Sequence, residues 1–129
     1  MLQLNGIHHI AIICSDYPVS KDFYTRILGL TVMQETYRPD RNSYKLDLAL
    51  NGKQTIELFS FDDVPPRVSY PEAAGLRHLA FEVDHLEDVC HYLKEQDISY
   101  EEVRRDELTG KQFLFISDPD ELPIEFYEK

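Results

Sequence analysis

The stretch HIAI at residues 9–12 returns as HLAF at residues 78–81, and TIELFS at 55–60 returns as PIEFYE at 123–128. The two offsets are 69 and 68 positions, so one residue of difference is left for a loop to absorb. Such a recurrence indicates two copies of one structural unit. The repeats cover residues 1–61 and 76–129. The segment between them, 62–75, holds three prolines and a closing glycine, which is typical of a linker.

Hydrophobic periodicity predicts a strand, a helix and three further strands in each copy. In the first copy, strands are expected at 6–13, 30–38, 44–50 and 55–61, and Asn51-Gly52 predicts a hairpin turn. Its helix follows a cap at Ser15 or Asp16, has Pro18 in its first turn and ends at Gly29.

In the second copy, strands are expected at 76–83, 98–103, 111–117 and 122–127. Asp84 and Glu87 resemble a capping box at the start of its helix. The sequence therefore predicts an α+β fold of two tandem βαβββ modules. One sheet face of each module would lie under its helix, and the other would curve towards a shared cleft.

Composition narrows the class of protein. The 129 residues fit one domain, and 13 Lys and Arg against 24 Asp and Glu give a net charge of −11. This balance argues against nucleic acid or an anionic membrane surface as a partner. No apolar run approaches the roughly 20 residues of a membrane span, and no signal peptide is evident. Cys14 and Cys90 form no CxxC pair, so we expect two small core thiols in a cytoplasmic protein.

The repeat places one His and one Glu at equivalent positions of each copy. His9 and Glu57 are 48 positions apart, and His78 and Glu125 are 47 apart. A single Glu that alternates with apolar residues is usually the solvent face of a strand. The coincidence in both copies instead predicts a metal site made of all four side chains. Two imidazoles and two carboxylates suit Zn, Ni, Co, Mn or Fe(II), with Zn or Ni favoured.

Other polar residues receive lesser roles. His8 has the wrong strand parity to join His9 and is expected in the core, whereas His85 and His91 are expected at the surface. A few cations could hold an anionic substrate: Arg38, Arg41, Lys45 and Arg77. Because Arg77 adjoins His78, alternation predicts that it points away from the cleft.

Three segments carry a resemblance to a known family. IHHIAIICSDYPVSKDFYTRILGL at 7–30, RHLAFEVDHLEDVCHYLKE at 77–95 and ISDPDELPIEFYE at 116–128 resemble the glyoxalase-type modules of the vicinal oxygen chelate superfamily. That superfamily includes glyoxalase I, bleomycin resistance proteins and dioxygenases. The resemblance spans residues 1–129 and implies eight strands around a metal in a concave cup.

The resemblance also implies roles for individual residues. His9, Glu57, His78 and Glu125 match the four ligand positions of the glyoxalase I group, and Glu125 or Glu57 would be the catalytic base. Extradiol dioxygenases of the superfamily use two His and one Glu, as do its metal-dependent thiol transferases that inactivate an epoxide antibiotic. A carboxylate at position 57 therefore favours lyase or isomerase chemistry.

The sequence departs from the glutathione-dependent members at two substrate positions. They have Arg and Asn where this chain has Ile13 and Phe61, and neither apolar side chain can hold a carboxylate or a peptide backbone. We therefore expect metal chemistry on a different small carbonyl substrate. An antibiotic-sequestering protein and a dioxygenase-type member are the alternatives. The superfamily also points to a homodimer, with the cup formed within one chain or across two.

Overall fold

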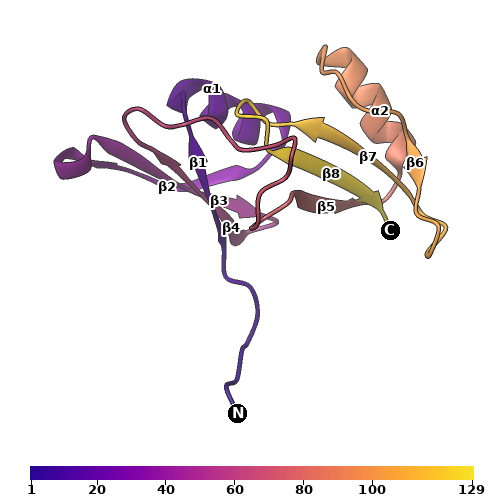
Figure 1. Ribbon diagram of the computed structural model, residues 1–129, viewed down its shortest axis with the longest axis horizontal. Helices are drawn as coiled ribbons and strands as arrows, with labels where there is room; N and C mark the ends of the chain where they lie inside the picture. Colours follow the sequence, from indigo (N-terminus) through magenta and orange to yellow (C-terminus); the bar gives the residue numbers. More distant parts are fainter. The chain divides into compact units, whose positions relative to one another are not determined.

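The computed structural model describes residues 1–129 and divides them into two compact units, residues 1–66 and 67–129. Each unit runs strand, helix, strand, strand, strand and forms its own four-stranded mixed sheet (Figure 1). No helix is long and apolar enough to span a bilayer. The prediction of an α+β fold with two βαβββ modules is confirmed.

In the first unit the sheet order is β1-β4-β3-β2. Its strands are β1 (Ile10–Cys14), β2 (Thr31–Arg38), β3 (Ser43–Leu50) and β4 (Lys53–Ser60), with a 3-10 turn at Pro39–Arg41. Strands β1 and β4 are parallel, and the other neighbours are antiparallel. Helix α1 (Tyr17–Asp22) continues as a π-helical turn, Phe23–Ile27.

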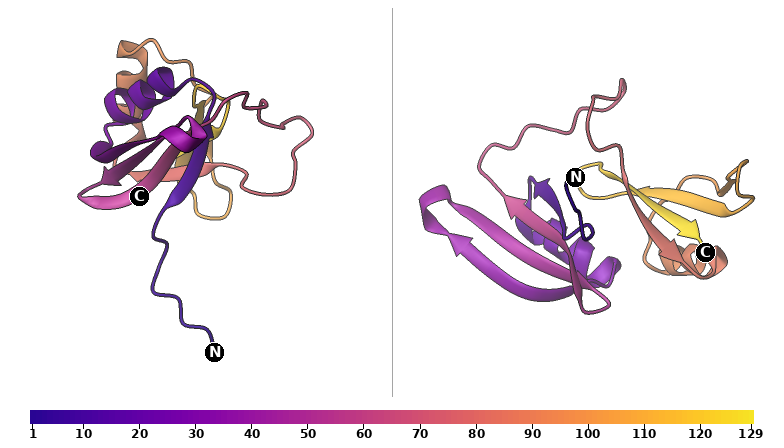
Figure 2. Two further views of the ribbon diagram at one scale, coloured as in Figure 1. Left: turned by 90° about the vertical axis from the view of Figure 1, so that its left-hand side faces the viewer. Right: turned by 90° about the horizontal axis from the view of Figure 1, so that it is seen from below.

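The second unit repeats this topology with the order β5-β8-β7-β6. Its elements are β5 (Leu79–Val83), α2 (Leu86–Glu95), β6 (Arg104–Arg105), β7 (Gln112–Ser117) and β8 (Pro123–Glu128). Strands β5 and β8 are parallel, and α2 packs against β7 and β8. The right-hand view of Figure 2 shows the strands and helix of each unit.

Alternation along the central strands separates a dry face from a polar one. In β4, Ile56 and Leu58 are fully buried, and in β8 Ile124 is fully buried beside Phe126. Side chains of a strand point alternately to opposite faces. Burying these residues therefore places Glu57 and Glu125 on the opposite face of each sheet, where Glu57 is largely covered and Glu125 is buried.

The first helix is anchored by its cap and by a polar contact to β2. Asp16 caps it by accepting from the Val19 amide, and Gly29 (φ 77°) follows it in the left-handed region, both as predicted. Tyr17 and Lys21 both donate to Glu35. Burial first, and then the bond to Glu35, raise the pKa of Tyr17 well above its usual range. The hydrogen bond from Lys21 is the main cause that lowers the pKa of Glu35.

Several predicted boundaries were wrong. The first strand begins at Ile10 rather than at residue 6, and residues 1–9 run away from β1 without regular structure (Figure 2, left). In the second unit, β5 begins at Leu79 rather than at residue 76, and 98–103 is not a strand. These segments bury too little apolar surface, or pair too little of their backbone with a neighbouring strand, to form a full strand.

The cap of α2 and the register of β3 also differ from what the sequence predicts. No side chain of its own segment caps α2; the Glu128 carboxylate of β8 accepts from the Leu86 amide at 2.9 Å instead of the predicted capping box. A register shift between Leu48 and Ala49 breaks the alternation of β3, so Ala49 is buried and Leu50 is exposed. Asn51 and Gly52 both have positive φ, as the predicted hairpin turn requires.

The repeat supplies a matched pair of core tests. Ile56→Ala and Ile124→Ala should each lower the free energy of unfolding by about 2–5 kcal/mol, because each removes a fully buried side chain. Urea denaturation measures the effect. As the control, Leu108→Ala alters a 96% exposed side chain and should stay within about 0.5 kcal/mol of the parent. Equal effects of Ile56→Ala and Leu108→Ala would contradict the packing of the first sheet.

Candidate metal centre

Each unit brings its predicted His and Glu together. His9 Nε2 lies 3.4 Å from Glu57 Oε2, and His78 Nε2 lies 2.8 Å from Glu125 Oε2. The side chains are also similarly exposed: 35% and 12% for the first pair, 31% and 12% for the second. Ala11 stands opposite Glu57 in the parallel ladder, as Ala80 stands opposite Glu125. His9 and His78 lie one residue before β1 and β5, two positions before these alanines.

The first pair lies among polar neighbours. The Gln54 amide donates to Glu57 Oε2 at 3.0 Å, and Lys45 Nζ lies 3.8 Å from the same oxygen. Lys45 also lies 3.2 Å from Asp47, which stands opposite Glu57 in the β3–β4 ladder. The Lys45 ammonium thus contacts two largely buried carboxylates, so Lys45 is already engaged within the protein.

Aromatic rings lie on one side of the second pair. The Phe115 ring packs edge-on against His78, with centroids 5.0 Å apart, and Phe115 stands opposite Glu125 in the β7–β8 ladder. Phe113 packs against Phe115 and Tyr127. The Nδ1 atom of His78 is buried and has no hydrogen-bond partner. Packing against Phe115 holds the His78 ring with Nε2 towards the Glu125 carboxylate.

The remaining histidines and the cysteines take no part in these pairs. His85 and His91 are exposed, as predicted. His8 is exposed too, with Nδ1 2.8 Å from that of His9, so its predicted core position was wrong because the strand begins only at Ile10. Cys14 is buried, Cys90 is partly buried, and neither forms a disulfide. No three His, Cys, Asp or Glu side chains are grouped for an ion within either unit.

Ile13 and Phe61 depart from the glutathione-dependent pattern, and they make one end of the sheet face that carries Glu57 apolar. Ile13 is 53% exposed and stands opposite Phe59, and Phe61 is 37% exposed and stacks on Phe59. The Arg38 guanidinium lies over both rings, 4.9 Å from the centroid of Phe59 and 5.7 Å from that of Phe61. This end offers apolar surface beside one stacked cation.

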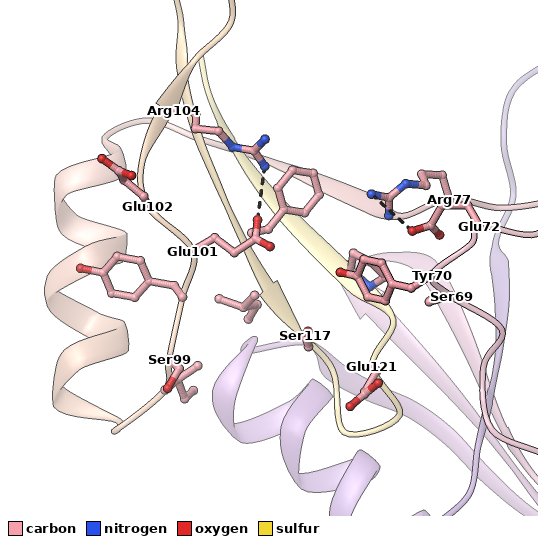
Figure 3. Close-up of a pocket in the computed structure, with 15 residues that line it drawn as sticks. Ser69, Tyr70, Glu72, Arg77, Ser99, Glu101, Glu102, Arg104, Ser117 and Glu121 are labelled. Atoms are coloured by element: carbon pink, nitrogen blue, oxygen red, sulfur yellow. Dashed lines mark hydrogen bonds and ion pairs between the residues drawn. The ribbon is translucent and has the colours of Figure 1, made fainter.

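A pocket of about 930 Å³ opens in the second unit and is shown in Figure 3. Its lining includes Phe115, Arg77 and Arg104. Arg77 lies before β5 begins and lines this pocket, and its direction relative to the cleft between the modules stays a prediction. Sequence reasoning missed Arg104. Its only signal was a basic pair, Arg104-Arg105, in a stretch of weak periodicity.

The comparisons with known proteins agree with this architecture. The family model "Glyoxalase/Bleomycin resistance protein/Dioxygenase superfamily" matches residues 6–126. The Bacillus subtilis (strain 168) protein YwkD is 60% identical over 128 residues, covering 99% of this chain and all of that protein.

Two solved structures are similar in fold. The glyoxalase family protein from Enterococcus faecalis is 49% identical, with a TM-score of 0.90 over 96% of this chain and 98% of that one. The fosfomycin resistance protein FosX from Listeria monocytogenes is 15% identical, with a TM-score of 0.75 over 98% and 94% of the two chains. At that identity FosX shares the fold alone. From the family match and the close relatives, this chain belongs to the Glyoxalase/Bleomycin resistance protein/Dioxygenase superfamily.

Proposed function

We propose that this chain is a cytoplasmic, glyoxalase I-like metalloenzyme that performs lyase or isomerase chemistry on a small carbonyl compound bearing a neighbouring oxygen. His9, Glu57, His78 and Glu125 would hold the divalent ion, and the two modules would act as one domain. The carrying observation is the duplicated pairing of an imidazole nitrogen with a carboxylate oxygen, at 3.4 Å and 2.8 Å.

The 3.4 Å distance in the first pair fits shared coordination, and the 2.8 Å distance in the second, which is that of a direct hydrogen bond, would widen by a few tenths of an ångström on binding an ion. Two donor atoms about 2.1 Å from one ion, at angles between octahedral and tetrahedral, lie about 3.0–3.4 Å apart. The mixed nitrogen and oxygen set suits Zn, Ni, Co, Mn or Fe(II), and two carboxylates balance the charge of a divalent ion. FosX, whose fold this chain shares, is described in complex with Mn(II) and dihydroxypropylphosphonic acid. This supports a metal here without indicating which one.

A bound divalent ion would polarise a substrate carbonyl and make the adjacent C–H more acidic. Glu57 or Glu125 would then take that proton on a carboxylate oxygen and return it to the neighbouring carbon. Gln54 orients Glu57 through its amide, and Phe115 fixes the ring beside Glu125. Lys45 Nζ forms an ion pair with the Glu57 carboxylate at 3.8 Å. Both carboxylates therefore have groups that hold them in place.

Metal content tests the ligand set directly. His9→Ala and His78→Ala should each remove most of the bound divalent ion, because each removes one of the two imidazole ligands. Elemental analysis of the purified variants measures this. His85→Ala and His91→Ala are the matched controls, since both side chains are exposed on other surfaces. Unchanged metal in the first two variants would show that the ligands are assigned wrongly.

The substrate prediction rests on Ile13 and Phe61. We expect weak or no turnover of the hemithioacetal of glutathione and methylglyoxal, compared with a smaller oxygenated carbonyl compound. The exposed apolar side chains at these positions offer no partner for the charged ends of glutathione. Steady-state assays on metal-loaded protein compare kcat/KM for the two. Efficient turnover at micromolar hemithioacetal would restore a lactoylglutathione lyase activity.

We also propose that the chain forms a homodimer. In the first unit β1 is an edge strand, as β5 is in the second, and an uncovered edge invites pairing. The segment before β1 exposes Leu2, Leu4 and Ile7, which are 86%, 82% and 77% accessible. A twofold arrangement would cover such edges and produce two equivalent cups.

Light scattering at low micromolar protein should give a mass near twice the 15.1 kDa of one chain. Salt of about 0.15 M screens the net charge beyond roughly 8 Å and so permits association. Repeating the measurement after chelation separates assembly from metal binding. A mass near that of one chain, with the metal still bound, would refute both the dimer and any cup built from two chains.

A further inference from the structure

The pocket in the second unit has the size of a small-molecule site and adjoins the His78–Glu125 pair. Its volume of about 930 Å³ lies at the upper end of the usual range for ligand pockets. Phe115 lines it and also packs against His78, with centroids 5.0 Å apart. The Phe115 ring therefore separates a molecule in this pocket from the proposed metal ligand His78.

Two arginines line this pocket. Figure 3 shows Arg77 and Arg104 entering from different segments with their guanidinium groups turned towards each other. The Arg67 guanidinium donates to the carbonyls of Leu76 and Arg77 at 2.9 and 3.0 Å, which fixes the backbone that carries Arg77. Arg104 lies over the rings of Phe113 and Phe115, 5.1 and 5.5 Å from their centroids. The stack leaves the edge of its guanidinium for an acceptor.

Neither arginine is held strongly within the protein. Arg77 Nη2 lies 4.0 Å from Glu72 Oε1, at the limit of an ion pair, and Arg104 Nη2 lies 3.2 Å from Glu101 Oε2. All four side chains are more than one-third exposed. Exposed pairs of this kind contribute little to stability. An incoming anion can replace the glutamates, which then return to water.

We propose that Arg77 and Arg104 bind the carboxylate of a small acid, so that the substrate class is a carbonyl compound bearing its own carboxylate. Paired guanidinium groups recognise carboxylates by bidentate hydrogen bonds. Glu102 and Glu121 also line the pocket and oppose further negative charge, so a single carboxylate fits better than a phosphate dianion. The link to substrate rests on the proposed function, whereas the anion site rests on the pocket alone.

Binding to metal-free protein tests the site without turnover. Pyruvate is the probe, hydroxyacetone is its neutral counterpart, and inorganic phosphate is the competing oxyanion, each titrated by NMR in the presence of a chelator. Pyruvate should shift the resonances of residues around the pocket, and hydroxyacetone should not. Arg77→Gln and Arg104→Gln should each weaken pyruvate binding by about tenfold.

Arg105→Gln is the matched control, because Arg105 is the neighbouring residue of β6 and does not line the pocket. It should bind pyruvate like the parent, and Arg104→Lys should fall between the parent and Arg104→Gln. Thermal melts of all variants confirm folding. Equal pyruvate binding by the parent and both Arg→Gln variants would overturn the site, and phosphate binding as tightly as pyruvate would overturn the carboxylate assignment.

Metal content separates this inference from the proposed function. Arg77→Gln and Arg104→Gln should retain the divalent ion, since neither residue is a proposed ligand. If His9→Ala and His78→Ala also retained it, the ligand set would fail while the pyruvate result stood on its own. Pyruvate binding lost in both Arg→Gln variants, with metal unchanged, supports the anion site specifically.

Discussion

Parallel pairing of the first and last strands of each module is the constraint on which the site depends. It sets Ala11 opposite Glu57 and Ala80 opposite Glu125, while the apolar neighbours of each Glu are buried under the helix. A slip of one residue would bury the carboxylate and expose the core, which is costly in both directions. Packing of the dry face therefore determines where the polar groups of the open face lie.

This coupling explains why the two His–Glu pairs could be predicted from the sequence. Period-two alternation around Glu57 and Glu125 fixes their face, and the repeat fixes which histidines precede them. The hairpin at Asn51-Gly52 and the cap at Asp16 were predictable for a similar reason, because each depends on residues within a few positions. Local chemistry and internal symmetry were sufficient for these features.

The features that sequence reasoning missed depend on contacts between distant segments. Glu128 caps α2 although it lies 42 positions after Leu86 in the sequence, and no local pattern near Leu86 predicts a partner in the last strand. Arg77 lies two residues before its strand begins, so alternation along the strand does not assign it to the pocket. The pocket is likewise lined by both Arg77 and Arg104. Arg104 lies in a two-residue strand, which is too short for hydrophobic periodicity to predict.

The two units share their His–Glu pairs but differ in what surrounds them, and this difference bears on function. Asp47 stands opposite Glu57, whereas Phe115 stands opposite Glu125 at the matching place of the second ladder. The first pair is thus braced by a carboxylate and Lys45, and the second by an aromatic wall that continues into a pocket. A duplicated fold supplies the pairs symmetrically, but a substrate is not symmetric. Divergence around the repeated His–Glu pair therefore gives the first module polar neighbours and the second an aromatic wall beside a pocket.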